Sequence, residues 1–123
     1  MTPTARTINL LEGRDWLVEI VEKRIPHTRP PITQDLFGVG DILAVRGHET
    51  VLIQVTDLAH NAAHVKKLKA EPKMHKWLVS GLRRLEVWAW RELKSSGRWE
   101  PRITVIALAD LDVDLTQPES PVE

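Results

Sequence analysis

Asp41, Gln54 and Thr56 stand out because they are polar side chains within two runs of otherwise apolar sequence rich in β-branched residues. The runs, residues 40–45 and 50–56, are separated only by residues 46–49, which predicts an antiparallel hairpin with a four-residue loop. In that register Asp41 lies opposite Gln54, and Thr56 shares their face one step along. The same register pairs Val45 with Thr50 and Leu43 with Leu52. We therefore expect a carboxyl, an amide and a hydroxyl group to gather at one end of the hairpin, as the first candidate for a chemical site.

An acid on one strand, followed on the next strand by an acid or amide, any residue and a lysine, is the signature of the PD-(D/E)XK (restriction-endonuclease-like) nucleases. This chain resembles that signature, with Gly40-Asp41 followed by Gln54-Val55-Thr56. The wider stretches 35–44 and 86–91 resemble small phage and prophage proteins of the same superfamily. The match covers roughly residues 6–105.

The resemblance implies metal-dependent hydrolysis of DNA phosphodiester bonds, in which a bound Mg²⁺ or Mn²⁺ positions and ionises a water. These cations prefer oxygen ligands, so the implied metal ligands are the Asp41 carboxylate, the Gln54 side-chain oxygen and the Val55 carbonyl. Gln54 departs from the acid that the family usually has, and Thr56 stands where the family usually has lysine. A neutral threonine cannot supply the charge of that lysine.

Other residues complete the implied catalytic set of Asp41, Gln54, Thr56, Lys67 and Glu22. Lys67, or its neighbour Lys66, reaches back from the following helix to replace the missing lysine. Glu22 supplies a further acid if the first strand lies beside Asp41, and Glu12 is the alternative. For each of these the competing interpretation is an ordinary charged residue at the surface.

Charge is distributed unevenly along a chain whose formal net charge is zero. Residues 66–102 contain eleven Lys and Arg against four Asp and Glu, whereas residues 103–123 contain five acids and no base. The basic segment is a candidate surface for nucleic acid, or a solvated helix face. Within and beside it we expect phosphate contacts from Asn61, Lys66, Arg83, Arg84 and Arg91.

Two other patterns have a structural alternative that we favour. His60 and His64 have the i,i+4 spacing of a helical zinc site, with Asp57 three residues earlier, but no clear third ligand accompanies them. Trp88 and Trp90 share one face of a strand and could stack on bases, although such a pair is more often part of the core.

Periodicity and turn residues predict an α/β fold, and the resemblance specifies a restriction-endonuclease-like core with a mixed central sheet: a helix, a three-strand meander, a helix and further strands. The predicted helices span residues 4–12, with Thr4 as N-cap, 58–69 and 73–80. The predicted strands are 16–22, the two hairpin strands, 85–91 and 103–108. Residues 24–34, with three prolines, are expected to form a loop.

Composition is that of one globular domain, with 42% apolar and 28% charged residues. We expect a single domain over residues 1–109 and an acidic, flexible tail over 110–123. The chain has no cysteine and no apolar run of about 20 residues. This predicts a cytoplasmic protein without a membrane segment, and a homodimer is compatible with the resemblance.

Two functions remain open beside the nuclease. The first is a catalytically inactive, nuclease-like module that binds nucleic acid or a protein partner, which the threonine at position 56 favours. The second is a structural or regulatory domain whose polar hairpin face is exposed to solvent. Burial of Asp41 is the feature that separates these interpretations.

Overall fold

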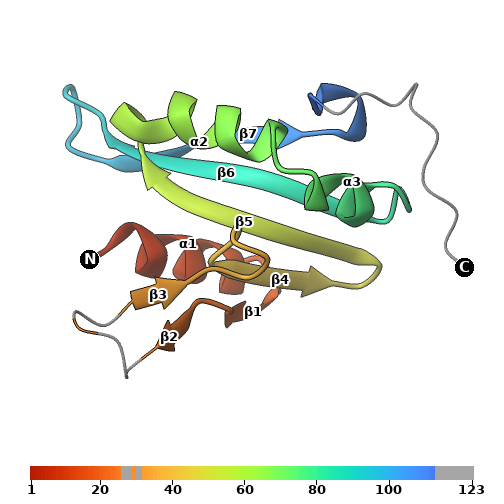
Figure 1. Cartoon of the computed structure of the whole chain (residues 1–123). Helices are drawn as coiled ribbons and strands as arrows, with labels where there is room; N and C mark the ends of the chain where they lie inside the picture. Colours follow the sequence, from red (N-terminus) through yellow and green to blue (C-terminus); the bar gives the residue numbers. More distant parts are fainter. Residues whose placement is uncertain (26–28, 30–31, 113–123) are drawn as a thin grey trace, which may run out of the picture.

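The computed structural model describes residues 1–25, 29 and 32–112 of the 123-residue chain. This part folds into an α/β arrangement in which a mixed sheet has helices on both faces (Figure 1). The predicted class, α/β with a mixed central sheet, is confirmed at this level. The helices are α1 (Pro3–Glu12), η1 (Leu58–His60), α2 (Asn61–Lys69), α3 (Lys73–Leu78) and η2 (Leu108–Asp110). The strands are β1 (Leu17–Ile20), β2 (Lys23–Ile25), β3 (Ile32–Gln34), β4 (Ile42–Arg46), β5 (Glu49–Asp57), β6 (Arg83–Glu92) and β7 (Trp99–Ile106).

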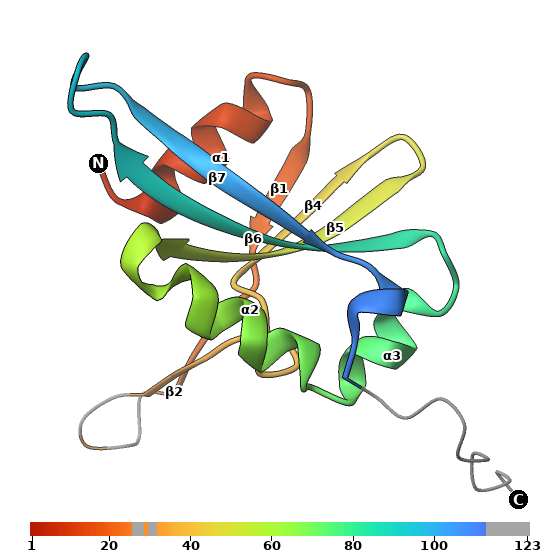
Figure 2. The ribbon, with the colours of Figure 1, turned by 90° about the horizontal axis from the view of Figure 1, so that it is seen from above.

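The central sheet has five strands in the order β1-β4-β5-β6-β7. β1, β4 and β5 form an antiparallel meander, β6 runs parallel to β5, and β7 returns antiparallel to β6. Parallel neighbours need a long crossover, and η1, α2 and α3 supply it across one face of the sheet (Figures 1 and 2). The first helix, α1, covers the opposite face.

Strict alternation along β5 and β6 sorts their side chains into two apolar layers. The layer against α1 contains Leu11, Ile42, Ile53, Trp88 and Trp90. The layer against α2 and α3 contains Leu52, Leu68, Met74, Leu85 and Val87. Trp88 and Trp90 are only 3% and 5% exposed, so the core placement that we favoured is confirmed and their faces are closed to bases.

A buried hydrogen bond fastens α1 to the sheet. The Thr7 hydroxyl accepts the Trp90 indole N–H at 2.8 Å and donates to the Pro3 carbonyl at 2.9 Å. Thr7 is fully buried, so this hydroxyl satisfies the one polar atom of the Trp90 ring inside an apolar layer.

The β4–β5 hairpin has the predicted register over most of its length. Leu43 pairs with Leu52 and Val45 with Thr50, as expected. The loop is shorter than predicted, because Arg46 and Glu49 continue the ladder and leave a two-residue turn. Gly47 in that turn has a φ of 58°, a conformation open to glycine at little cost.

The segment 24–34, predicted as a loop, contains parts of two strands. β2 and β3 pair antiparallel, with Lys23 opposite Gln34 and Ile25 opposite Ile32, in a separate two-stranded sheet. The isoleucines favour extended backbone and outweigh the turn composition around them. The prolines behind the loop prediction, at positions 26, 30 and 31, lie outside the described residues.

Most other predicted boundaries move by a few residues. The N-cap of α1 is Thr2, whose hydroxyl accepts the Ala5 N–H at 3.1 Å, and Thr4 lies inside the helix. The predicted helix 58–69 starts as the 3-10 turn η1, because the Asp57 carboxylate accepts the His60 N–H at 3.0 Å. The last strand starts earlier than predicted, at Trp99.

The predicted acidic tail begins within an ordered turn. Asp110 belongs to η2, and the Asp112 N–H donates to the Lys69 carbonyl at 2.9 Å. Residues 113–123 lie outside the described part of the chain. No helix in the described part is both long and apolar enough to cross a membrane.

A substitution at Gly40 tests whether the backbone just before β4 must lie directly against the core residue Leu52. A Cβ atom at this position would overlap Cγ and Cδ1 of the fully buried Leu52. We expect Gly40→Ala to lower the free energy of unfolding by about 1–3 kcal/mol, through overpacking. Urea unfolding followed by circular dichroism measures the change. Gly47→Asn is the control, since nothing lies within 4 Å of a Cβ atom there and asparagine tolerates its φ of 58°; equal stability of Gly40→Ala and the native chain would refute the close approach.

Candidate functional site

Asp41 lies where β1, β4 and β5 meet. The backbone carbonyl of Asp41 accepts the Val21 N–H at 3.0 Å, and the backbone N–H of Asp41 donates to the Ile53 carbonyl at 3.1 Å. Its side-chain Oδ1 accepts the Val55 N–H at 3.1 Å. Asp41 is only 8% exposed, so its carboxylate oxygen replaces a backbone carbonyl as the acceptor for the Val55 N–H inside the sheet.

A tight loop over residues 36–40 brings Asp41 to this place. The Leu36 N–H donates to the Gly40 carbonyl at 2.8 Å, and the Gly40 N–H donates to the Leu36 carbonyl at 3.2 Å. Phe37 and Gly38, at the tip, have positive φ values of 57° and 70°, which reverse the chain. Because the loop closes on itself, Asp35 before it and Asp41 after it come near one another.

The pKa of Asp41 is raised to about 7, first by burial and then by the negative charges of Asp35 and Glu22, which together outweigh the lowering effect of the Val55 N–H. Burial and then Glu22 also raise the pKa of Asp35. We call Glu22, Asp35 and Asp41 the acidic cluster. Glu22 follows β1, which is the neighbour of β4, so the condition under which it was expected to approach Asp41 is met.

Positive charge reaches the acidic cluster from α2. Lys67 and His64 both lower the pKa of Asp35, against the effect of burial. Lys67 is the residue expected to reach back from this helix, and the structure brings it to the acidic side of the sheet. His64 therefore acts on Asp35, whereas His60 lies 2.7 Å from the Asp57 carboxylate. The two histidines have different partners, which does not favour a shared zinc ion.

Gln54, Val55 and Asp41 form one chain of hydrogen bonds. Gln54 is 7% exposed, and its Nε2 donates to the Val55 carbonyl at 3.2 Å, while the N–H of the same Val55 donates to Asp41. The ladder of β4 and β5 ends at the Ile42–Ile53 pair and does not include the expected pairing of Asp41 with Gln54, because the Asp41 N–H donates to the Ile53 carbonyl. The three predicted metal ligands are nevertheless neighbours.

Thr56 is half-buried beside Ala89 of β6 and continues the face of Gln54. It adds a hydroxyl to this end of β5 and no charge. The positive charge that acts on Asp35 comes from Lys67 and His64 on α2 and not from β5.

The oxygen atoms around Asp41 could hold a hard cation such as Mg²⁺ with few protein ligands and several waters. Within residues 1–25, 29 and 32–112, no three His, Cys, Asp or Glu side chains are arranged to hold a metal ion. Mg²⁺ needs fewer, since it is commonly bound by one or two carboxylates and keeps several waters. Asp41, with the oxygens of Val55 and Gln54, matches that pattern, and a cation would offset the unfavourable burial of the Asp41 charge.

The three arginines expected to contact phosphate already have protein partners. Arg84 Nη1 lies 2.8 Å from Glu49 Oε1 and its Nε 3.3 Å from Glu86 Oε2, and Arg91 Nη2 lies 3.1 Å from Glu100 Oε1. Arg83 donates to the backbone carbonyls of Trp77, at 2.8 Å, and Lys76, at 3.2 Å. Phosphate binding by these side chains stays a prediction, but the geometry does not gather them into one open basic surface.

Asn61 and Lys66 do come together, in a pocket of about 400 Å³ between α2 and β7 that Lys69 and Arg102 also line. The Asn61 Oδ1 is buried and has no hydrogen-bond partner in the described part of the chain. Asn61 and Lys66 therefore share one surface, and Arg83 and Arg84 share another, where both line a pocket of about 270 Å³ beside β7.

Sequence reasoning did not single out Asp35 as a site residue. The available signal was an acid immediately before the glycine-containing loop 36–40, six positions from Asp41. A loop that closes on itself brings its two ends together, and this is the step that was missing.

The raised pKa of Asp41 predicts how stability depends on pH. Between the unfolded value near 4 and the folded value near 7, the folded state binds a proton that the unfolded state has lost, so stability falls as pH rises through this window. The fall amounts to at most about 4 kcal/mol. Asp41→Asn should flatten it and be more stable than the native chain at pH 8, as measured by urea unfolding from pH 4 to 8. Asp57→Asn is the control, because the pKa of Asp57 is lowered by its hydrogen bond with His60. A native profile in Asp41→Asn would contradict the assignment.

Comparisons of the chain with protein-family models, with curated proteins and with solved structures find no match. The function is therefore argued from the geometry of the acidic cluster and its neighbours.

Proposed function

We propose that the chain is a metal-dependent nuclease that hydrolyses phosphodiester bonds in DNA and belongs to the PD-(D/E)XK, restriction-endonuclease-like type. One observation carries the proposal. A buried carboxyl group, Asp41, has two more acids beside it, with a lysine of the next helix within electrostatic reach of the cluster. Carboxyl groups whose pKa is strongly shifted by burial and like charge are concentrated at functional sites.

In this proposal Mg²⁺ or Mn²⁺ is held by Asp41, with the Gln54 side-chain oxygen and the Val55 carbonyl as further ligands. When bound, the cation would lower the pKa of a water and stabilise charge on the phosphate oxygens. The Val55 N–H holds Asp41 in place, and this hydrogen bond leaves the second carboxylate oxygen for other contacts. Glu22 and Asp35 keep the local potential negative, which favours a cation.

In this proposal Lys67 supplies the positive charge that the neutral Thr56 lacks. The Lys67 ammonium group already stabilises the negative charge of Asp35, so from α2 it can also stabilise negative charge that develops beside the acidic cluster during the reaction. Lys67 is a positioning residue in this scheme, which orients the attacking water and neutralises negative charge. The proton that the water loses would pass to a carboxylate that is not a metal ligand, and Asp35, whose pKa is raised by burial and by Glu22, lies beside the proposed metal site.

The second candidate is a nuclease-like module that binds nucleic acid or a protein partner without cutting. The neutral residues Gln54 and Thr56 favour it, because an amide holds a dication less strongly than a carboxylate does. The two candidates share the fold and the acidic cluster, and they differ in the consequence of adding metal.

Cleavage of plasmid, single-stranded and branched DNA is the direct test. With Mg²⁺ or Mn²⁺ we expect cutting that EDTA abolishes and that Asp41→Asn lowers by on the order of 100-fold or more. Lys67→Met should lower the rate as well, whereas Lys69→Met, two residues along the same helix, should cut normally. Addition of Thr56→Lys to Lys67→Met tests the role of the charge, since it returns a lysine to β5. Cutting by Asp41→Asn at the native rate would end the nuclease proposal.

Metal binding can be measured without catalysis. At pH 8 we expect Mg²⁺ to raise the melting temperature of the native chain, because it binds the ionised Asp41 of the folded state. At pH 6 the rise should be smaller, since a proton then competes for the same carboxyl group. Asp41→Asn should show no rise at either pH. A rise of equal size in that variant would place the cation elsewhere, and binding without cleavage would favour the second candidate.

A further inference from the structure

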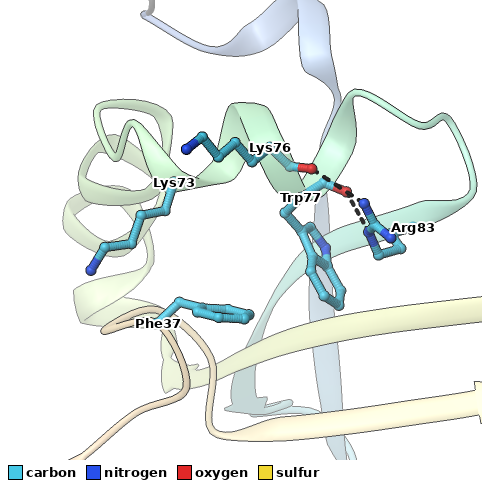
Figure 3. A pocket seen from close by; sticks show the side chains of 5 residues that line it. All are labelled: Phe37, Lys73, Lys76, Trp77 and Arg83. Carbon is cyan, nitrogen blue, oxygen red and sulfur yellow. Dashed lines mark hydrogen bonds between the residues drawn. The ribbon is translucent and has the colours of Figure 1, made fainter. Parts of the chain in front are cut away.

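A second pocket lies at the tip of the loop whose base carries Asp35 and Asp41. Phe37, Lys73, Lys76, Trp77 and Arg83 line it, and its volume is about 350 Å³, within the range of small-molecule sites. Figure 3 shows Trp77 and Phe37 next to one another beneath α3, with Lys73 and Arg83 on opposite sides of the two rings. Two aromatic rings bordered by positive charge are the complement of a flat, anionic ligand.

The Trp77 ring is fixed before any ligand arrives. The Trp77 indole N–H donates to the Arg84 carbonyl at 2.9 Å, and the Arg83 guanidinium lies 5.3 Å from the Trp77 ring centroid. The Arg83 hydrogen bonds to the carbonyls of Lys76 and Trp77 hold that guanidinium in turn (Figure 3). A ligand that stacks on this ring therefore meets a surface that loses little freedom on binding.

Phe37 is held in an unfavourable state that packing alone does not explain. Its φ of 57° is in the left-handed region, which bulky residues rarely adopt, and its side chain is 47% exposed. The Phe37 and Trp77 centroids are 6.2 Å apart with the ring planes at 52°, which is the geometry of a contacting aromatic pair, so a planar ligand would stack on an open ring face of the pair. Residues with strained backbone conformations are concentrated at functional sites.

Lys73 and Lys76 supply the positive charge of the pocket. Both are exposed, and neither forms an ion pair with any residue that the structure describes. The neighbouring acid Glu71 accepts the backbone N–H of Lys73 at 3.2 Å and forms no ion pair with either ammonium group. Their ammonium groups thus remain open to an external anion, in contrast to Arg84 and Arg91.

We propose that this pocket binds an unpaired nucleotide, with its base stacked on Phe37 and Trp77 and its phosphate contacted by Lys73 and Lys76. Aromatic stacking with neighbouring cations is the way in which single-stranded nucleic acid is bound without sequence preference. A base inside a duplex has no free face to offer, so the pocket selects single-stranded or locally opened strands. The identification of single-stranded nucleic acid as the substrate of a nuclease rests on the proposed function. The binding of a nucleotide in this pocket does not.

Fluorescence anisotropy in EDTA tests the binding without metal or cleavage. A fluorescein-labelled single-stranded oligonucleotide should bind, and a blunt duplex of equal length should bind at least about 10-fold more weakly. Lys73→Met/Lys76→Met and Phe37→Asn should each weaken single-strand binding roughly 5-fold or more. Asparagine tolerates the φ of position 37, so this variant should keep the native melting temperature. Lys94→Met/Arg98→Met removes the same charge from the exposed turn between β6 and β7 and should bind normally.

Competition identifies the source of the nucleotide. Displacement by adenosine monophosphate indicates a site for free nucleotides as well as strands, and displacement by unlabelled oligonucleotide alone indicates a nucleotide within a strand. Equal binding of duplex and single strand, or equal loss in both double variants, would overturn the proposal, as would no binding at all. Retained single-strand binding by a native chain that cuts no DNA rejects the nuclease and leaves the pocket intact.

Discussion

The hydrogen bond from the Val55 N–H to the Asp41 carboxylate is the interaction on which the arrangement of the site depends. A sheet that loses a backbone acceptor in its interior must replace it, because a buried and unpaired N–H costs about 1–3 kcal/mol. Asp41 makes the replacement with its side chain, and this places a carboxylate where an apolar residue would otherwise lie. This carboxylate is surrounded by the loop that precedes Asp41, by the end of β1 and by the Gln54 amide. Structural and chemical requirements on Asp41 are therefore inseparable.

Two surfaces of different chemistry lie at the two ends of the same short loop. Its base carries Asp35 and Asp41 in a negative, partly buried setting, and its tip carries Phe37 beside lysines and an arginine. The Leu36–Gly40 bridge keeps the loop closed, and Gly40 lets it lie against the core. The spacing between the two surfaces is thus set by the backbone and not by mobile side chains.

Local patterns were sufficient for the hairpin register and for the two faces of β6, because a period of two assigns each side chain to one side of a sheet. They were not sufficient at Asp41, where the ladder of β4 and β5 ends and the Asp41 carbonyl accepts the N–H of Val21, just after β1. They also failed for the arginines. One partner of Arg84 is Glu49, which lies 35 positions away, and no local pattern announces such a pair. Asp35 was missed for the same reason, because its neighbours are brought by a loop and a helix.

The hydrogen bond between Thr7 and Trp90 joins residues 83 positions apart. The surface that α1 covers is completed by Trp88 and Trp90, so the first helix to leave the ribosome has no finished partner until β6 has been made and paired. A helix of ten residues is marginal by itself in water. Its docking therefore belongs to the late, slow part of folding that long sequence separations impose. The beginning of the chain is, in the order of events, one of its last parts to become native.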